Sequence, residues 1–192
     1  MPDGIDPALT KALVEAEGDV ARHGVVIIRT IETELVPSIM AAARISIESS
    51  PRRLSKLSDE ELDALVQSLR KSATRSAKDL RKLYTRVLSK LGNEDIIELE
   101  KDLEGIGELF GWKRISESAN PVNELLEEQG FPRIDLSGPE DIADNLAVEL
   151  NEKWRGAFTR FSDAVTRLAQ EIRSEESRPP SPVKKKREKR GG

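Results

Sequence analysis

The sequence predicts an all-α protein: an elongated helical bundle that contains a long coiled-coil-type helix and ends in a disordered basic tail. Two observations predict this class. Apolar residues recur in steps of three and four along most of the 192-residue chain, which is the period of an amphipathic helix. The chain is also 34% charged and only 4% aromatic, a composition typical of long solvated helices rather than of a compact enzyme core.

Residues 1–50 are predicted to form an N-terminal helical segment. Asp6 is a typical N-cap and Pro7 a typical first helical residue. The first helix is predicted to stop at Gly24, because glycine commonly follows the last helical turn. His23 is the only histidine of the chain, and we expect it to satisfy free carbonyl groups at this helix end.

The apolar residues beyond this point continue at helical spacing. They predict a second helix over 25–49, kinked at Pro37, where the ring removes one backbone hydrogen bond. The run Val-Val-Ile-Ile over 25–28 leaves a short strand open as the alternative.

Residues 51–92 have the clearest pattern in the chain, that of a long basic helix. Ser58 and Glu61 form a capping box, and Gly92 follows the last apolar residue. Between them runs a heptad ridge with one polar position: Leu62, Val66, Leu69, Ala73, Ser76, Leu80, Leu83 and Val87. Such a ridge requires a lengthwise helical partner, in the same chain or in a second copy. We expect a homo-oligomer whose self-association residues are Leu62, Val66, Leu69, Leu80, Leu83 and Val87.

Residues 93–177 are predicted to form an acidic helical region that ends in a long helix. The predicted order is a helix capped by Asn93, irregular chain over 111–119, a short helix ended by Gly130, and a long helix opening at Gly138. The last helix carries most of the aromatic residues. Their helical spacing favours a place in the core, with a partner-binding groove as the alternative: Trp154, Phe158 and Phe161.

The net charge of −4 conceals three blocks of opposite sign. Residues 52–91 hold 11 Lys and Arg against five Asp and Glu, residues 94–152 hold four against 17, and residues 178–190 hold seven against one. Such blocks indicate either internal pairing or separate binding surfaces. The cations of 70–90 are therefore expected either to lie along a phosphate backbone or to face the acidic region of the same molecule or of its neighbour, and the adjacent acidic block favours internal pairing.

Residues 178–192 are predicted to be a disordered tail, because a proline-rich spacer is followed by a segment with no burial pattern. Six tail cations are candidates for nucleic-acid binding through counterion release: Lys184, Lys185, Lys186, Arg187, Lys189 and Arg190. This cluster resembles a nuclear localisation signal, and Ser181-Pro182 resembles a proline-directed kinase site. The expected partners are a second copy of the chain, RNA or DNA, and another helical protein.

The composition excludes several kinds of site. The chain has no cysteine and one histidine, which excludes disulfides, thiolate catalysis and histidine-rich metal sites. No run of about 18 apolar residues is present, so we expect no transmembrane helix. The acidic N-terminus lacks the apolar core of a secretion signal, so we expect a soluble intracellular protein, cytoplasmic, or nuclear in a eukaryotic host.

Acidic pairs three residues apart support an alternative, enzymatic interpretation: Glu124 with Glu127, Asp141 with Asp144, and Glu149 with Glu152. Each pair shares a helix face on which two carboxylates can hold Mg²⁺. The first two pairs resemble those of all-helical nucleotide pyrophosphohydrolases, which implies Mg²⁺-dependent hydrolysis. A chain this rich in Asp and Glu produces such spacings by chance, so we expect solvated surface, no catalytic residue, no metal and no cofactor.

The function that the sequence favours is that of a non-enzymatic scaffold or adaptor. Its helical part would self-associate and its basic tail would contact nucleic acid, so that assembly multiplies weak contacts. This division resembles the architecture of viral or phage nucleic-acid-packaging and scaffold proteins. A Mg²⁺-dependent nucleotide hydrolase and a protein-only adaptor are the alternatives.

Overall fold

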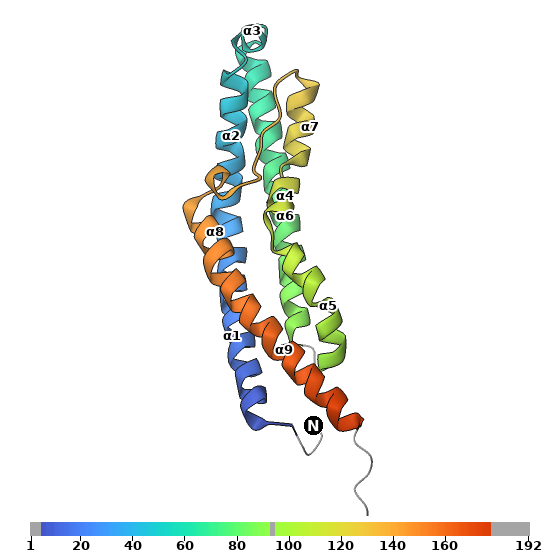
Figure 1. Cartoon of the computed structure of the whole chain (residues 1–192). Coiled ribbons are helices and arrows are strands. Elements are labelled where there is room, and N and C mark those ends of the chain that lie inside the picture. Colours follow the sequence, from blue (N-terminus) through green and yellow to red (C-terminus); the bar gives the residue numbers. More distant parts are fainter. Residues whose placement is uncertain (1–4, 93–94, 178–192) are drawn as a thin grey trace, which may run out of the picture.

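The computed structural model describes residues 5–92 and 95–177, which form an elongated bundle made of helices (Figure 1). These residues contain no strand, and the predicted all-α class is confirmed. None of the helices in these two ranges has the length and apolar character needed to cross a bilayer. The predicted tail, with its six cations, lies outside the described residues.

The fold begins with one long helix that has a π-helical turn in its middle. Its parts are α1 (Pro7–Thr30), the π-helical turn η1 (Ile31–Leu35) and α2 (Val36–Glu48). Asp6 caps the start, since its side chain accepts a hydrogen bond from the Ala8 N–H at 2.8 Å. The strand alternative for 25–28 is wrong, because these residues lie within α1.

The predicted stop at Gly24 is also wrong, because α1 continues through this residue. Gly24 is buried, and a Cβ there would lie 2.5 Å from Leu88 Cδ2 of the neighbouring helix. The glycine therefore permits a close approach between helices rather than a helix end. A kink was predicted at Pro37, and the π-helical turn η1 lies directly before this part of the helix. The proline nitrogen has no hydrogen to donate to the Thr33 carbonyl, and the wider turn accommodates the missing bond.

A short helix, α3 (Pro51–Leu54), turns the chain into α4 (Asp59–Leu91), which has 33 residues and is about 50 Å long. Ser58 and Glu61 form the predicted capping box: the Ser58 Oγ accepts from the Glu61 N–H, and the Glu61 carboxylate accepts from the Ser58 N–H. Gly92 is the C-cap. Both predicted ends of this helix are confirmed.

The remaining elements fold back along this pair. They are α5 (Ile96–Leu109), α6 (Trp112–Glu117), α7 (Asn120–Glu128), the 3-10 turn η2 (Pro139–Asp141), α8 (Asp144–Val148), the π-helical turn η3 (Glu149–Trp154) and α9 (Arg155–Glu176).

Three predictions for this region require correction. Asp95, not Asn93, caps α5, and its side chain accepts from the N–H groups of Ile97 and Glu98. The segment 111–119 contains a helix rather than irregular chain, and the long C-terminal helix begins at Asp144, because the residues before it form only a single turn. Gly130 ends α7 as predicted, with a φ of 76° that glycine adopts without strain.

The two ends of the bundle differ in how many helices they contain. At one end α1, α4, α5 and α9 pack in a ring, in which each helix contacts two neighbours. At the other end α2 and α7 both pack on α4, and an extended connector runs down between them (Figure 1). The Ser46 Oγ holds this connector by donating to the Pro132 carbonyl, and the Asn123 side chain pairs with both backbone groups of Ile134.

The core at the four-helix end contains a stack of aromatic rings. Tyr84, Phe110, Trp154 and Phe158 follow one another with ring centroids 4.1, 4.4 and 4.8 Å apart. Trp154 and Phe161 are buried and Phe158 is half-buried. These rings join α4, the end of α5, η3 and α9, so the aromatic face of the last helix belongs to the core.

Candidate functional site

The outer face of α4 carries a row of cations, which we call the basic stripe: Lys71, Arg75, Lys78, Lys82 and Arg86. Successive members are three or four residues apart, so they share one face of the helix. All are exposed, while the opposite face buries residues such as Leu69, Ala73 and Leu80 in the core. The stripe therefore presents charge to solvent along about 22 Å of helix.

Most of the basic stripe has no ion-pair partner within the described residues. Lys82 lies 3.6 Å from the Asp79 carboxylate, and the other four cations form no ion pair in this part of the chain. Arg81, which lies outside the stripe, pairs with Glu32 of η1. Among the α4 cations, Lys90 alone pairs with the acidic region described here, 3.5 Å from Asp102. Within the described residues of one chain the stripe does not pair with the acidic region, so internal pairing is wrong for it, and pairing with the acidic region of a neighbouring copy stays a prediction.

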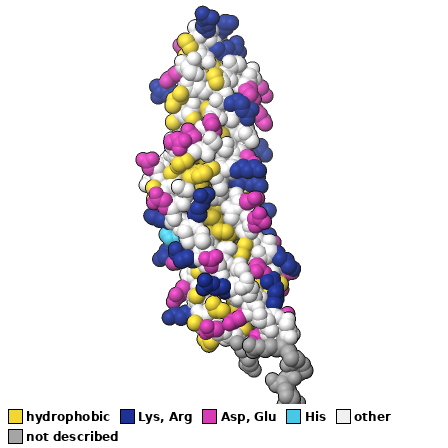
Figure 2. Space-filling view, in the orientation of Figure 1, with side chains coloured by type: hydrophobic (Ala, Val, Ile, Leu, Met, Phe, Trp, Pro, Cys, Tyr) yellow, Lys and Arg dark blue, Asp and Glu magenta, His cyan; other side chains and the backbone are white. Residues whose placement is uncertain are grey.

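Charges elsewhere on the surface are mixed. On the face seen in Figure 2, Lys and Arg are interspersed with Asp and Glu along the length of the bundle. Several of these are local pairs within one helix, such as Arg44 with Glu48 at 2.7 Å and Lys101 with Glu98 at 2.6 Å. Paired charges of this kind neutralise each other, which sets the basic stripe apart.

The heptad ridge divides between the core and the surface. Leu69 is fully buried, and Ala73, Leu80 and Val87 are also buried, because α1, η1 and α2 pack along α4 in the same chain. The other four ridge residues are half-buried: Leu62, Val66, Ser76 and Leu83. Self-association through the ridge stays a prediction, and its accessible residues are these half-buried ones.

Leu62 and Val66, two of these half-buried residues, line a groove between α2 and α4, which we call the α2–α4 groove. Its volume is about 590 Å³. Leu62, Val66 and Leu69 form one wall, and Met40, Ala43 and Ile47 form the other. The charged residues among its lining are Arg44, Glu48, Asp63 and Arg70. The groove is thus an apolar channel with charged side chains beside it.

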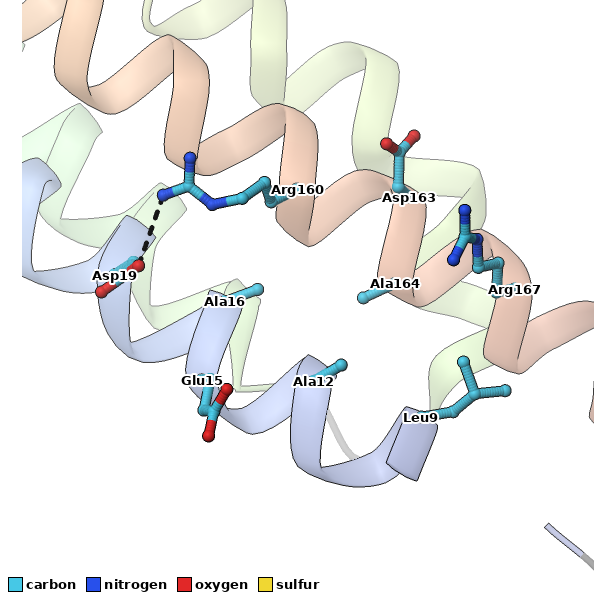
Figure 3. Close-up of a pocket in the computed structure, with 9 residues that line it drawn as sticks. All are labelled: Leu9, Ala12, Glu15, Ala16, Asp19, Arg160, Asp163, Ala164 and Arg167. Atoms are coloured by element: carbon cyan, nitrogen blue, oxygen red, sulfur yellow. Dashed lines mark hydrogen bonds and ion pairs between the residues drawn. The ribbon is translucent and has the colours of Figure 1, made fainter. Parts of the chain in front are cut away.

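A second groove, of about 370 Å³, lies between the start of α1 and α9 (Figure 3). Ala12, Ala16 and Ala164 lie between its charged residues, and Arg160 of α9 reaches across to Asp19 of α1 at 3.3 Å. The residues that line it include no serine, threonine, cysteine, lysine or histidine. Its charged residues are three acids, Glu15, Asp19 and Asp163, and two cations, Arg160 and Arg167.

No protein-family model matches the chain, and no characterised protein or solved structure is significantly similar to it.

One member of each acidic pair, Glu127, Asp141 or Glu149, has a structural partner. Glu127 pairs with Arg133 at 2.9 Å, and the Asp141 carboxylate accepts from the Gly138 N–H at 3.0 Å. In the described part of the chain, no three His, Asp or Glu side chains gather in a way that would hold a metal ion. The described geometry therefore supplies no support for a shared magnesium site.

His23 has a role that the sequence did not indicate. It lies within α1 rather than at a helix end, so the predicted capping role is wrong. Its Nδ1 donates to the Glu149 carboxylate of η3 at 2.5 Å, and the Lys153 Nζ lies 3.2 Å from the other oxygen. Glu149 is buried, so its carboxylate loses hydration. The contacts from His23 and Lys153 compensate for that loss.

The α2 wall of the groove was also missed. Met40, Ala43 and Ile47 follow one another at steps of three and four, which is the same signal that revealed the heptad ridge on α4. Ile31, Leu35 and Ile39 form the buried row of the long N-terminal helix, and the groove wall is a second apolar row beside it.

Proposed function

We propose that the chain is a non-enzymatic helical scaffold that self-associates and contacts nucleic acid. The basic stripe carries the nucleic-acid part of this proposal, because four of its five cations have no ion-pair partner among the described residues. A cation that already pairs with a carboxylate gains little from a phosphate. An unpaired one gains the favourable release of the counterions condensed on the nucleic acid.

The length and straightness of the stripe suit a phosphate backbone. Its span of about 22 Å covers about six steps of 3.4 Å along one strand of a duplex. The stripe consists of Lys and Arg alone, and contacts to phosphates carry no sequence information. Binding without sequence preference, strongly weakened by salt, is therefore expected.

The tail predicted to bind nucleic acid adds six cations, Lys184 to Lys186, Arg187, Lys189 and Arg190. A self-associated scaffold would bring several stripes and tails to one strand, so that weak contacts act together. This combination supports a scaffold that organises a nucleic acid over an adaptor that binds protein alone.

The test is fluorescence anisotropy with a labelled duplex and a labelled single strand of the same length, between about 50 and 200 mM salt. Replacing Lys71, Arg75 and Lys78 with glutamine removes three phosphate contacts. The slope of log K against log salt for the duplex should then become shallower by up to about 2.7, since each contact contributes about 0.9. Replacing the six tail cations with glutamine should also make this slope shallower, whether or not the stripe cations are replaced.

The matched control removes the same charge from cations that are already paired: Lys11, Arg22 and Lys101, also replaced with glutamine. This variant should bind nearly as well as the parent chain. The proposal is wrong if the parent chain does not bind at the lowest salt, or if the control weakens binding as much as the stripe variant. Self-association without any binding would instead indicate the protein-only adaptor.

A further inference from the structure

We infer that the α2–α4 groove is a self-association surface, on which a second copy of this chain packs with the two α4 helices antiparallel about a two-fold axis near Val66. The assignment rests on the self-association proposed above and names its surface and symmetry. Three features of the described residues support it: an unfilled position in the bundle, half-buried apolar residues, and a pattern of charge that is complementary to itself.

The bundle is less complete at the end where the groove lies. The opposite end closes with four helices, whereas here α2 and α7 both pack on α4 and the connector 129–143 covers one side. The α2–α4 groove is lined by α2, α3 and α4 and by no residue of that connector. Helices from a second copy would supply the missing neighbours and complete a four-helix arrangement.

Five of the apolar residues that line the groove are not fully covered by their own chain, while Ala43, Ile47 and Leu69 are buried. Met40, Leu54, Leu62 and Val66 are half-buried, and Ala41 is exposed. Leu62 and Val66 are also the first two members of the heptad ridge, which predicts a lengthwise helical mate. Burying these side chains against a second helix would remove apolar surface from water.

The charges beside the groove indicate that the mate is a second copy. Asp63 and Arg70 are both exposed, and neither forms an ion pair within the described residues. They are seven residues apart, which places them on the same side of α4, about 10 Å apart along the axis. A two-fold axis midway between them brings Asp63 opposite Arg70 of the second copy and Arg70 opposite its Asp63.

This arrangement produces two equivalent ion pairs, as an isologous interface requires. The α2 wall adds little net charge, because Arg44 and Glu48 pair with each other at 2.7 Å. None of the residues of the basic stripe lines the groove, so a dimer leaves both stripes accessible. The interface thereby joins the two parts of the proposed function, assembly and polyanion contact.

Charge exchange tests the two-fold geometry directly. Asp63→Arg places like charges at both predicted pairs, and so does Arg70→Asp. Sedimentation velocity over a concentration series should show each variant dimerising at least about tenfold more weakly than the parent chain. An equimolar mixture of the two variants should recover association, because each predicted pair in the heterodimer again has opposite charges. The double variant Asp63→Arg/Arg70→Asp should dimerise like the parent.

Two further variants separate this result from general effects. Asp79→Arg makes the same charge change on the same helix away from the groove and should leave dimerisation unchanged. Val66→Glu places a charge in the apolar channel and should weaken dimerisation about a hundredfold. Far-UV circular dichroism and thermal unfolding establish that each chain is folded.

The inference is overturned if the parent chain is monomeric up to about 100 μM, a range in which weak specific interfaces still associate. It is equally overturned if the two single variants dimerise like the parent or if their mixture fails to associate. A monomer that still shows stripe-dependent nucleic-acid binding removes this surface and keeps the nucleic-acid proposal. A charge-dependent dimer that binds no nucleic acid keeps this surface and overturns the nucleic-acid proposal.

Discussion

Gly24 and Leu88 provide the sharpest test of how the long helices approach each other. Substituting alanine for a glycine inside a helix normally gains about 1 kcal/mol of helix stability. At Gly24, however, the new Cβ would lie 2.5 and 2.7 Å from the two Leu88 methyl carbons. The far end of the half-buried Leu88 side chain must then shift, and overpacking of this kind costs up to about 1–3 kcal/mol. Gly24→Ala should therefore leave stability unchanged or lower it by up to about 2 kcal/mol.

Gly18 on the same helix is the matched control, because nothing lies within 4 Å of the position that its Cβ would occupy. Gly18→Ala should gain about 1 kcal/mol, which corresponds to about 2–4 °C in Tm for a chain of this size. Leu88→Ala removes the obstacle to a Cβ at Gly24. In that background, Gly24→Ala should also gain about 1 kcal/mol.

The assay is urea unfolding followed by far-UV circular dichroism, with the four chains of the Gly24 and Leu88 double-mutant cycle measured side by side. The coupling between the two sites should be about 1–3 kcal/mol. The reasoning is refuted if Gly24→Ala stabilises the otherwise unchanged chain as much as Gly18→Ala does. That result would mean that α1 and α4 are not held at the distance described.

Two other predictions concern buried polar groups. Burial raises the pKa of Tyr84, the only tyrosine, above its ordinary value of 10.0. The unfolded chain therefore loses this proton first, and the free energy of unfolding should fall by about 1.4 kcal/mol per pH unit as the pH rises above that value. Tyr84→Phe should remove that slope, measured by urea unfolding at several pH values, with tyrosinate absorbance of the parent chain appearing only on unfolding. Independently, His23→Ala should lower the free energy of unfolding by about 1–3 kcal/mol, because the buried Glu149 carboxylate loses a donor. Lys153→Ala should cost less in the same assay, since that side chain is half exposed, and equal costs would contradict this ranking.

The function test and the dimer test address different sides of α4. The basic stripe lies outside the lining of the α2–α4 groove, so variants of one site are expected to leave the other intact. A chain that loses nucleic-acid binding through Lys71, Arg75 and Lys78 should still dimerise. This independence allows the two proposals to fail separately.

The amino-acid sequence by itself determined the helical class and the ends of α4. These features are local: the capping box joins Ser58 to a residue three positions away, and Gly92 ends the helix beside its last turn. The same holds for the Asp6 cap and for Gly130. Because such signals act within about one helical turn, they can be read without knowing what packs against the helix.

The tertiary structure decided everything that depends on how two helices face each other. It decided that Gly24 is a contact point, that His23 meets a carboxylate 126 residues away, and that Lys90 alone among the α4 cations pairs with the acidic region described here. It also decided which part of the heptad ridge the chain covers for itself. These outcomes depend on the rotation and register of whole helices, and a spacing pattern constrains the face of one helix but not the neighbour that it meets.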